Sequence, residues 1–91
     1  MPQDGTYNSY VKVTALSTAV NLPSIPVNVQ YALIQCENGD VRWRADGTAP
    51  TTTDGMLMPA GTERTFDSGS ISRLQFIQTS AAATLHVSYY T

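Results

Sequence analysis

The single histidine of the chain, His86, stands beside residues that could take part in catalysis. Thr84 and Ser88 flank it at a spacing of two, so on a β-strand the three side chains share one face. A serine beside a histidine is typical of a nucleophilic site in which the imidazole acts as the general base. Such a site also needs a strained nucleophile turn such as G-x-S-x-G, and the sequence contains none. We therefore interpret His86 as a surface histidine without catalytic partners, and we expect no enzyme activity.

Four aspartates stand next to turn-forming residues, where their carboxylates could bind calcium. Their spacing does not match the D-x-[DN]-x-[DN]-G pattern of a calcium loop, and aspartate favours turns because its carboxylate bonds to nearby backbone N–H groups. These residues are Asp40, Asp46, Asp54 and Asp67. We predict that they form turns and that the protein has no metal site.

The only cysteine, Cys36, lies in an apolar stretch without a second cysteine or a neighbouring base. A single cysteine excludes a disulfide within the chain, and together with one histidine it is too little for an ordinary structural zinc site. We predict that Cys36 is a small buried side chain. No cofactor is expected.

The only tryptophan, Trp43, lies between Arg42 and Arg44 and could stack on a sugar ring or a base. Alternation instead points Trp43 inward together with Val41 and places the two arginines on the opposite face. In a domain of this size a lone tryptophan is more often part of the core. We therefore predict that Trp43 is buried.

The stretch around this tryptophan contains the strongest turn signals of the chain. Asn38-Gly39 can adopt the left-handed conformations of a tight turn, which predicts a β-hairpin between residues 29–36 and residues 41–44. A long ordered loop is expected at residues 46–55, because Thr and Asp side chains can bond to their own backbone. The apolar residues 56–58 are then predicted to return to the core.

The remaining pattern is a series of short alternating segments separated by turns, without a helical period. Further strands are expected at residues 9–15, 19–22, 62–66, 71–79 and 83–90. The fold class predicted is all-β, an antiparallel β-sandwich or jelly-roll-like barrel of about seven to eight short strands. Residues 1–8 are expected to form a flexible arm, and residues 9–91 a single β-domain.

Some apolar side chains exceed what one small core can cover. Residues 29–36 are apolar on both faces, which is typical of a central strand or of a subunit contact. Ile71 and Ile77 fall on the nominally outer face of the segment at 71–79. A domain of 91 residues buries only about 60–65% of the surface that its unfolded chain exposes, so association is expected, as a homotrimer or a dimer. The contact residues predicted for oligomers or partners are Tyr31, Leu33, Ile71, Ile77, Arg42, Arg44, Thr51, Thr52 and Thr53.

The charge content disfavours nucleic acid as a partner, and the lack of a long apolar run disfavours a membrane. The net charge is -2 and the charged fraction is 13%, whereas phosphate binding depends on clustered Lys and Arg. No segment resembles a signal peptide, and no apolar run approaches the roughly 20 residues of a membrane span. We expect neither nucleic-acid nor membrane binding, and synthesis in the cytoplasm.

Two segments, residues 41–66 and 74–90, resemble small virion proteins of tailed bacteriophages. In such sequences a strand with an Arg-aromatic-Arg run leads to a DGT-x-PT loop, a glycine and an AG turn, and the chain closes with an L-x-V-x-YY strand. The matching residues are Arg42, Trp43, Arg44, Asp46, Gly47, Thr48, Pro50, Thr51, Gly55, Ala60, Gly61, Phe76, Ile77, Leu85, Val87, Tyr89 and Tyr90. The resemblance implies a structural subunit located in the virion.

Within that class, the function expected first is that of a capsid decoration or cement protein, which binds the major capsid protein or another virion protein on the outside of the phage head. One alternative is a tail or head-tail component, or a carbohydrate-binding module on a fibre, which the tryptophan and five tyrosines permit. A small hydrolase built around His86 is the least favoured. Residues 46–55 are expected to carry the recognition, because loops held by strands commonly do so.

Overall fold

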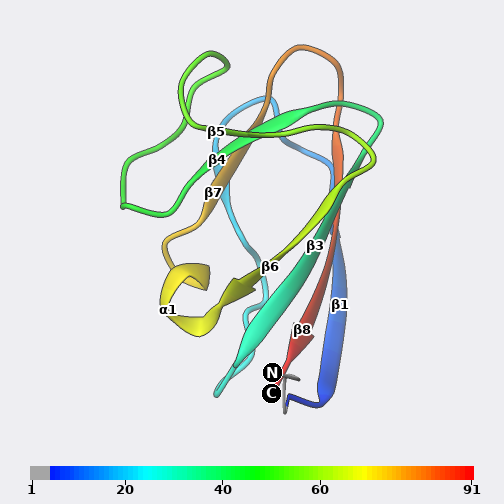
Figure 1. The fold of residues 1–91 in the computed structure, drawn as a ribbon, viewed down its shortest axis with the longest axis vertical. Helices are drawn as coiled ribbons and strands as arrows, with labels where there is room; N and C mark the ends of the chain where they lie inside the picture. The colour runs from blue at the N-terminus through cyan, green and yellow to red at the C-terminus, as the bar shows by residue number, and fades with distance from the viewer. Residues whose placement is uncertain (1–4) are drawn as a thin grey trace.

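Alternating apolar residues pair into two antiparallel sheets in the computed structural model, which describes residues 5–91 (Figure 1). The elements in chain order are β1 (Tyr7–Val13), β2 (Val20–Asn21), β3 (Tyr31–Glu37), β4 (Val41–Arg44), β5 (Met56–Met58), β6 (Glu63–Asp67), α1 (Ser68–Ile71), β7 (Gln75–Gln78) and β8 (Thr84–Tyr90). One sheet has the strand order β1-β8-β3-β6 and the other β2-β7-β4-β5. The predicted all-β sandwich is therefore confirmed.

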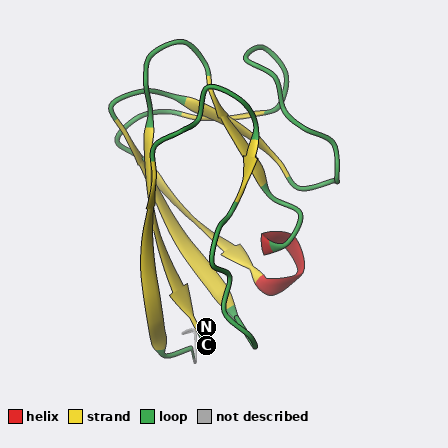
Figure 2. Cartoon of the chain, turned by 180° about the vertical axis from the view of Figure 1, so that it is seen from behind, coloured by secondary structure: helices red, strands yellow, loops and turns green. Residues whose placement is uncertain are grey.

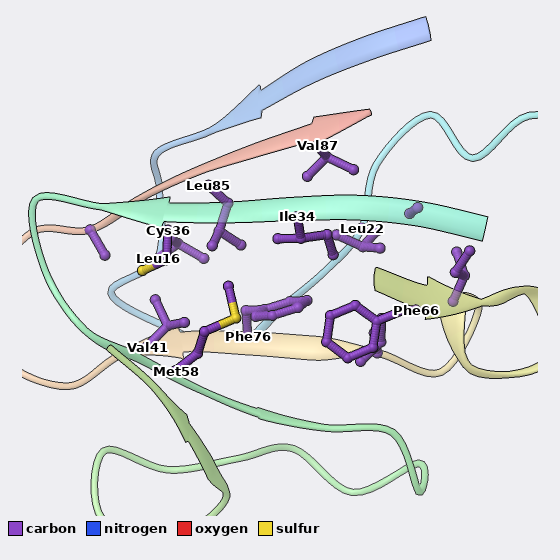
Figure 3. Packing of buried hydrophobic residues seen from close by; sticks show 14 of the residues in the cluster. Leu16, Leu22, Ile34, Cys36, Val41, Met58, Phe66, Phe76, Leu85 and Val87 are labelled. Carbon is purple, nitrogen blue, oxygen red and sulfur yellow. The ribbon is translucent and has the colours of Figure 1, made fainter. Parts of the chain in front are cut away.

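The two sheets enclose one core, as the side chains between them show (Figure 3). Ile34 on β3 and Leu85 on β8 are fully buried and face Val41 on β4 and Phe76 on β7. The positions on β4, β7 and β8 follow the two-residue period of each strand and were predictable from alternation, whereas β3 is apolar on both faces and alternation left its inward face open. Cys36 is buried in the same cluster, as predicted.

The last strand of the chain lies in the middle of its sheet. β8 pairs antiparallel with β1 on one side and with β3 on the other. The amide of Thr91 donates to the carbonyl of Thr6 at 2.8 Å, so the two ends of the described chain lie side by side (Figure 1). β3 lies between β8 and β6, so of the two alternatives for residues 29–36, a central strand or a subunit contact, the structure shows a central strand.

The predicted hairpin at Asn38-Gly39 is wrong, although the turn itself exists. Asn38 adopts a φ of 72°, but the chain then crosses to the other sheet, where β4 pairs with β5 and β7. Both edges of β3 are already occupied by β6 and β8. Gly39 is required at the crossing, because a Cβ there would lie 2.7 Å from the carbonyl oxygen of Ala81.

The strand predicted at residues 71–79 begins later than expected, and Ile71 does not face outward. Asp67 caps a short turn of helix, α1, by accepting a hydrogen bond from the Ser70 amide at 3.0 Å. The helical turn rotates Ile71 into the core, where it is 1% exposed (Figure 2 shows the turn in red). Ile71 is therefore a core residue and not an oligomer or partner contact.

Two further predictions differ from the structure at the ends of elements. β1 begins at Tyr7, so Tyr7 and Asn8 of the predicted arm belong to the sheet, while residues 1–4 lie outside the described part of the chain. Among the apolar residues 56–58, only Met58 returns to the core. Met56 and Leu57 stay exposed because β5 is the edge strand of its sheet.

Candidate functional site

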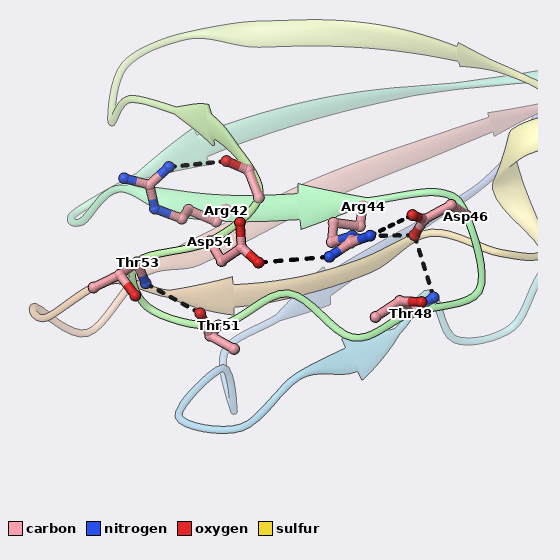
Figure 4. A network of polar contacts seen from close by, with 8 residues as sticks. Arg42, Arg44, Asp46, Thr48, Thr51, Thr53 and Asp54 are labelled. Carbon is pink, nitrogen blue, oxygen red and sulfur yellow. Dashed lines mark hydrogen bonds and ion pairs between the residues drawn. The ribbon is translucent and has the colours of Figure 1, made fainter.

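The loop between β4 and β5 projects from one end of the sandwich and is held by side chains from β4 (Figure 4). Arg42 donates through Nη1 to the carbonyl of Gly55 at 2.9 Å and through Nε to that of Thr52 at 3.2 Å. An arginine suits this role because its planar group presents several donors in a fixed arrangement. Alternation correctly placed Arg42 on the outer face of β4, but its guanidinium is used within the chain.

The second arginine of β4 holds the start of the same loop. Arg44 donates to both carboxylate oxygens of Asp46, and its Nη1 lies 3.7 Å from Oδ2 of Asp54 at the far end of the loop. The guanidinium of Arg44 and the amide of Thr48 hold the pKa of the Asp46 carboxyl below its usual value. Figure 4 shows this network spanning the loop.

Backbone contacts complete the loop and leave its tip exposed. Thr51 donates its amide to the carbonyl of Asp54 at 2.9 Å, and its side-chain oxygen accepts from the amide of Thr53 at 3.4 Å. Gly55 has a φ of 134° and lies so close to β4 and Pro50 that a Cβ would be 3.1 Å from the Pro50 ring. The prediction of an ordered loop is confirmed, and the three threonines at residues 51–53 face solvent.

A depression of about 570 Å³ lies at the base of the loop. It is lined by Trp43, Arg44, Ala45, Asp46, Asp54, Gly55 and Met56. Trp43 faces inward, as predicted, but it is half-buried. Its ring meets Phe66 edge-on at 4.9 Å, with the Arg64 guanidinium 5.4 Å from the ring centre.

Two exposed apolar side chains follow on β5, Met56 beside Trp43 on the inner face of the sheet and Leu57 beside Arg42 on the outer face. Met56 and Leu57 are 58% and 51% exposed, and the edge of β5 away from β4 has no partner strand within residues 5–91. Large exposed apolar side chains beside an ordered loop are typical of a protein contact. The sequence pattern had placed these residues in the core, because three consecutive apolar residues carry no signal of an edge position.

His86 has partners that the sequence analysis missed. Its Nε2 lies 2.7 Å from a carboxylate oxygen of Glu37 on β3, and its Nδ1 lies 2.7 Å from the hydroxyl of Tyr10 on β1. The sequence analysis expected a surface histidine without catalytic partners and did not foresee these two contacts. No local pattern could reveal the contacts, since the three residues are far apart in sequence and meet through the pairing of β8 with both neighbours.

The residues predicted to contact partners fall in separate places. Arg42, Arg44 and the three threonines belong to the β4–β5 loop, and Ile77 lies beside Arg42 on the outer face of the same sheet. Tyr31 and Leu33 lie on the outer face of the other sheet, where the rings of Tyr31 and Tyr90 stack at 4.5 Å. The structure therefore provides two candidate surfaces, one at the loop and one on the β1-β8-β3-β6 sheet.

The remaining candidate groups have structural roles. Burial raises the pKa of the Cys36 thiol to about 11, and the thiol donates to the carbonyl of Gly39. The carboxylates of Asp46 and Asp67 accept nearby backbone amides, as predicted for turn residues, whereas the carboxylate of Asp40 accepts the amide of Ala60, 20 residues along the chain. Within residues 5–91 no group of three or more His, Cys, Asp or Glu is placed to hold a metal ion.

Comparisons with family models, curated proteins and solved structures find no match for this chain. Over the described residues, no helix has the length and apolar character needed to cross a membrane.

Proposed function

We propose that this protein is a structural virion subunit that decorates the outside of a phage head and contacts the major capsid protein through the β4–β5 loop. The observation that carries the proposal is the loop itself, an exposed tip at residues 51–53 fixed by Arg42 and Arg44. The resemblance of residues 41–66 and 74–90 to phage virion proteins supports the major capsid protein as the partner. In this role the protein is located in the virion.

The loop suits attachment because its conformation is set before the partner arrives. An unrestrained loop loses conformational freedom on binding, and this loss reduces affinity. Here the guanidinium of Arg42 and the Arg44–Asp46 pair fix the loop in the free protein. The neighbouring Met56 and Leu57 add apolar surface that a partner can cover.

A second candidate, a carbohydrate-binding module on a tail or fibre, is favoured by the depression at the base of the loop. Trp43 offers part of a ring for stacking, while Asp46 and Asp54 offer carboxylates that accept hydrogen bonds from hydroxyl groups. Two features weaken this alternative. Arg64 lies over the Trp43 ring, and Arg44 occupies both carboxylates.

The decisive experiment is to locate the protein on the intact particle by cryo-electron microscopy and to measure its binding to purified heads. Density repeated over the outer surface of the head is expected. The variant Thr52→Glu should then reduce co-sedimentation with heads at least about tenfold, because it places a charge at the centre of the contact. Its side chain makes none of the hydrogen bonds that fix the loop, so the fold should be unaffected.

Thr18→Glu is the matched control, since it introduces the same charge in a different exposed loop. It should bind heads as the unmodified protein does. Location on the tail or fibre, together with retention on a glycan array that Trp43→Ala abolishes, contradicts the decoration role and supports the carbohydrate-binding alternative.

A further inference from the structure

The outer face of the β1-β8-β3-β6 sheet carries aromatic side chains arranged in rows across the strands. At one end Tyr7, Tyr90 and Tyr31 lie side by side on three strands, with ring centres 6.0 and 4.5 Å apart. Tyr10 and Leu33 follow in the next row, with Ser88 between them and Thr65 at the β6 edge. Tyr7 and Tyr10 are 57% and 51% exposed, so this face is more apolar than a solvated sheet requires.

The third row carries opposite charges at its two ends. Lys12 on β1 lies beside His86, His86 beside Gln35, and Gln35 beside Glu63 on β6. Lys12 and Glu63 are both exposed. Because β1 and β6 are the two edge strands, the positive and the negative side chain stand at equal distances from the midline of the sheet, which runs between β8 and β3.

We propose that a second copy of this chain binds this face through a two-fold axis parallel to the strands. Such an axis places β1 of one copy over β6 of the other and keeps every row in register. Lys12 of each copy then faces Glu63 of the other, so the interface contains two equivalent ion pairs. Tyr10 faces the smaller Thr65, and Tyr31 faces Tyr90.

The shape of this face also fits the proposed dimer, because a hollow on one copy lies opposite a large side chain of the other. A hollow of about 280 Å³ lies over Ser88 and is lined by Tyr10, Leu33, Gln35, Glu37, His86 and Ser88. The two-fold axis places Leu33 of the second copy opposite Ser88, so that each leucine enters the hollow of the other subunit. Small and large side chains therefore meet at both equivalent positions.

The other two-fold axis in the plane of the sheet, perpendicular to the strands, gives a poorer match. It places Lys12 against Tyr10 and Glu63 against Thr65, so neither charge meets its opposite. It also reverses the rows, so that the three tyrosines lie over the end that carries Glu37. The parallel axis also agrees with the aligned packing that is common between β-sheets.

The size of the face predicts a weak dimer. Four strands of five to seven residues cover at most roughly 20 by 23 Å, or about 450 Å² on each copy, whereas stable interfaces bury about 800 Å² per partner. We expect a dissociation constant on the order of 100 µM in solution. This inference favours the dimer over the trimer that the sequence analysis placed first, and it does not depend on the capsid role, since it concerns a different surface.

Sedimentation velocity on the full chain, up to about 1 mM, tests the proposal with a charge swap. Lys12→Glu and Glu63→Lys should each weaken self-association at least about tenfold, because like charges then face each other at both ends of the interface. An equimolar mixture of the two variants should associate about as well as the unmodified protein. In the mixed dimer each introduced charge faces an opposite charge.

Arg73→Glu is the control, since it changes the net charge by the same amount as Lys12→Glu but lies on the segment after α1. It should leave the dissociation constant unchanged. If Glu63→Lys fails to fold because Glu63 no longer accepts from Gln35, Glu63→Gln replaces it, with a several-fold weakening expected. A protein that stays monomeric at about 1 mM, or single variants that associate like the unmodified chain, overturns the proposal.

Discussion

Arg44 and Asp46 are two residues apart in the sequence, and the guanidinium of the first donates to both carboxylate oxygens of the second. This geometry closes the first turn of the β4–β5 loop before any partner is present. The Asp46 side chain is exposed, so the pair sets the conformation of the loop more than it stabilises the fold.

We predict that Asp46→Asn loosens the loop and leaves the melting temperature nearly unchanged. Backbone amides of residues 47–55 should exchange with deuterium faster than in the unmodified protein, while those of β3 and β8 keep their protection. Asp54→Asn serves as the control, because Asp54 only approaches Arg44 at 3.7 Å. Exchange in Asp46→Asn as slow as in the unmodified protein would show that the Arg44–Asp46 pair does not hold the loop.

The same pair predicts a pH dependence of the loop. Because the folded pKa of Asp46 lies below the ordinary value of 3.8, the contact is fully present above pH 3.8 and is lost as the pH falls through the lowered pKa. Amide chemical shifts of residues 47–55 should therefore stay constant down to that pH and change only below it. Changes beginning well above pH 3.8 would contradict the prediction.

Trp43→Ala should lower the free energy of unfolding by about 2–3 kcal/mol, less than a fully buried tryptophan would cost, because the ring is half-buried. The loss comes from the edge-on contact with Phe66 and from the Arg64 guanidinium over the ring. Urea denaturation of the variant and of the unmodified protein measures this change in the free energy of unfolding. Met56→Ala on the neighbouring exposed strand is the control and should cost less than about 0.5 kcal/mol. Equal costs would mean that Trp43 does not anchor the core.

His86→Ala should cost about 1 kcal/mol, because it removes two hydrogen bonds that join β8 to β1 and β3. A double-mutant cycle with Glu37→Gln should give a coupling energy of a few tenths of a kcal/mol or more. Ser88→Ala, on the same strand face, should leave stability unchanged. No coupling between positions 86 and 37 would contradict the contact.

The free energy of unfolding should fall at alkaline pH, because the buried Cys36 thiol and Tyr89 phenol resist ionisation in the folded protein. Burial raises the pKa of Cys36 from 9.0 to about 11 and that of Tyr89 from 10.0 to about 12. Both groups favour the neutral form when folded, so stability is fully present below the ordinary pKa values and declines as the pH rises toward the raised ones. Each group contributes about 2–3 kcal/mol to this loss.

Tyr89→Phe isolates the phenol in a pH series of urea denaturation curves. The variant loses the hydrogen bond from the Tyr89 hydroxyl to the carbonyl of Pro23, so it starts less stable. It should nevertheless decline less between pH 10 and about 12 than the unmodified protein. The exposed Tyr7→Phe should keep the full decline, and a steep decline in Tyr89→Phe would contradict the prediction.

Alternation along single strands accounts for most of what the sequence could predict. It places Leu85, Val87 and Phe76 inward, and these side chains are fully buried on strands that the structure contains. The period is a property of each strand alone, so it needs no knowledge of the partner strand. The orientation of Trp43 and of its flanking arginines followed from the same rule.

The errors arise where a residue's environment depends on pairing or on a local cap. Asn38 forms its turn, but whether the chain returns to β3 or crosses to the other sheet depends on β6 and β8, which occupy the edges of β3. Ile71 was misplaced because Asp67 starts a turn of helix within an apparently alternating segment. Asp67 is a typical helix N-cap residue, so the helical turn could have been predicted from this local sequence signal.

The position of β8 has a consequence for how the chain folds. Within the described chain, β1 pairs only with β8, so β1 stays unpaired during synthesis until residues 84–90 have been made. The sheet then closes through contacts between residues far apart in sequence, which is typical of folding on the millisecond-to-second scale. Nascent chains that end before β8 leave one edge of β1 and one edge of β3 unpaired, and these edges are open to aggregation until residues 84–90 have emerged and paired.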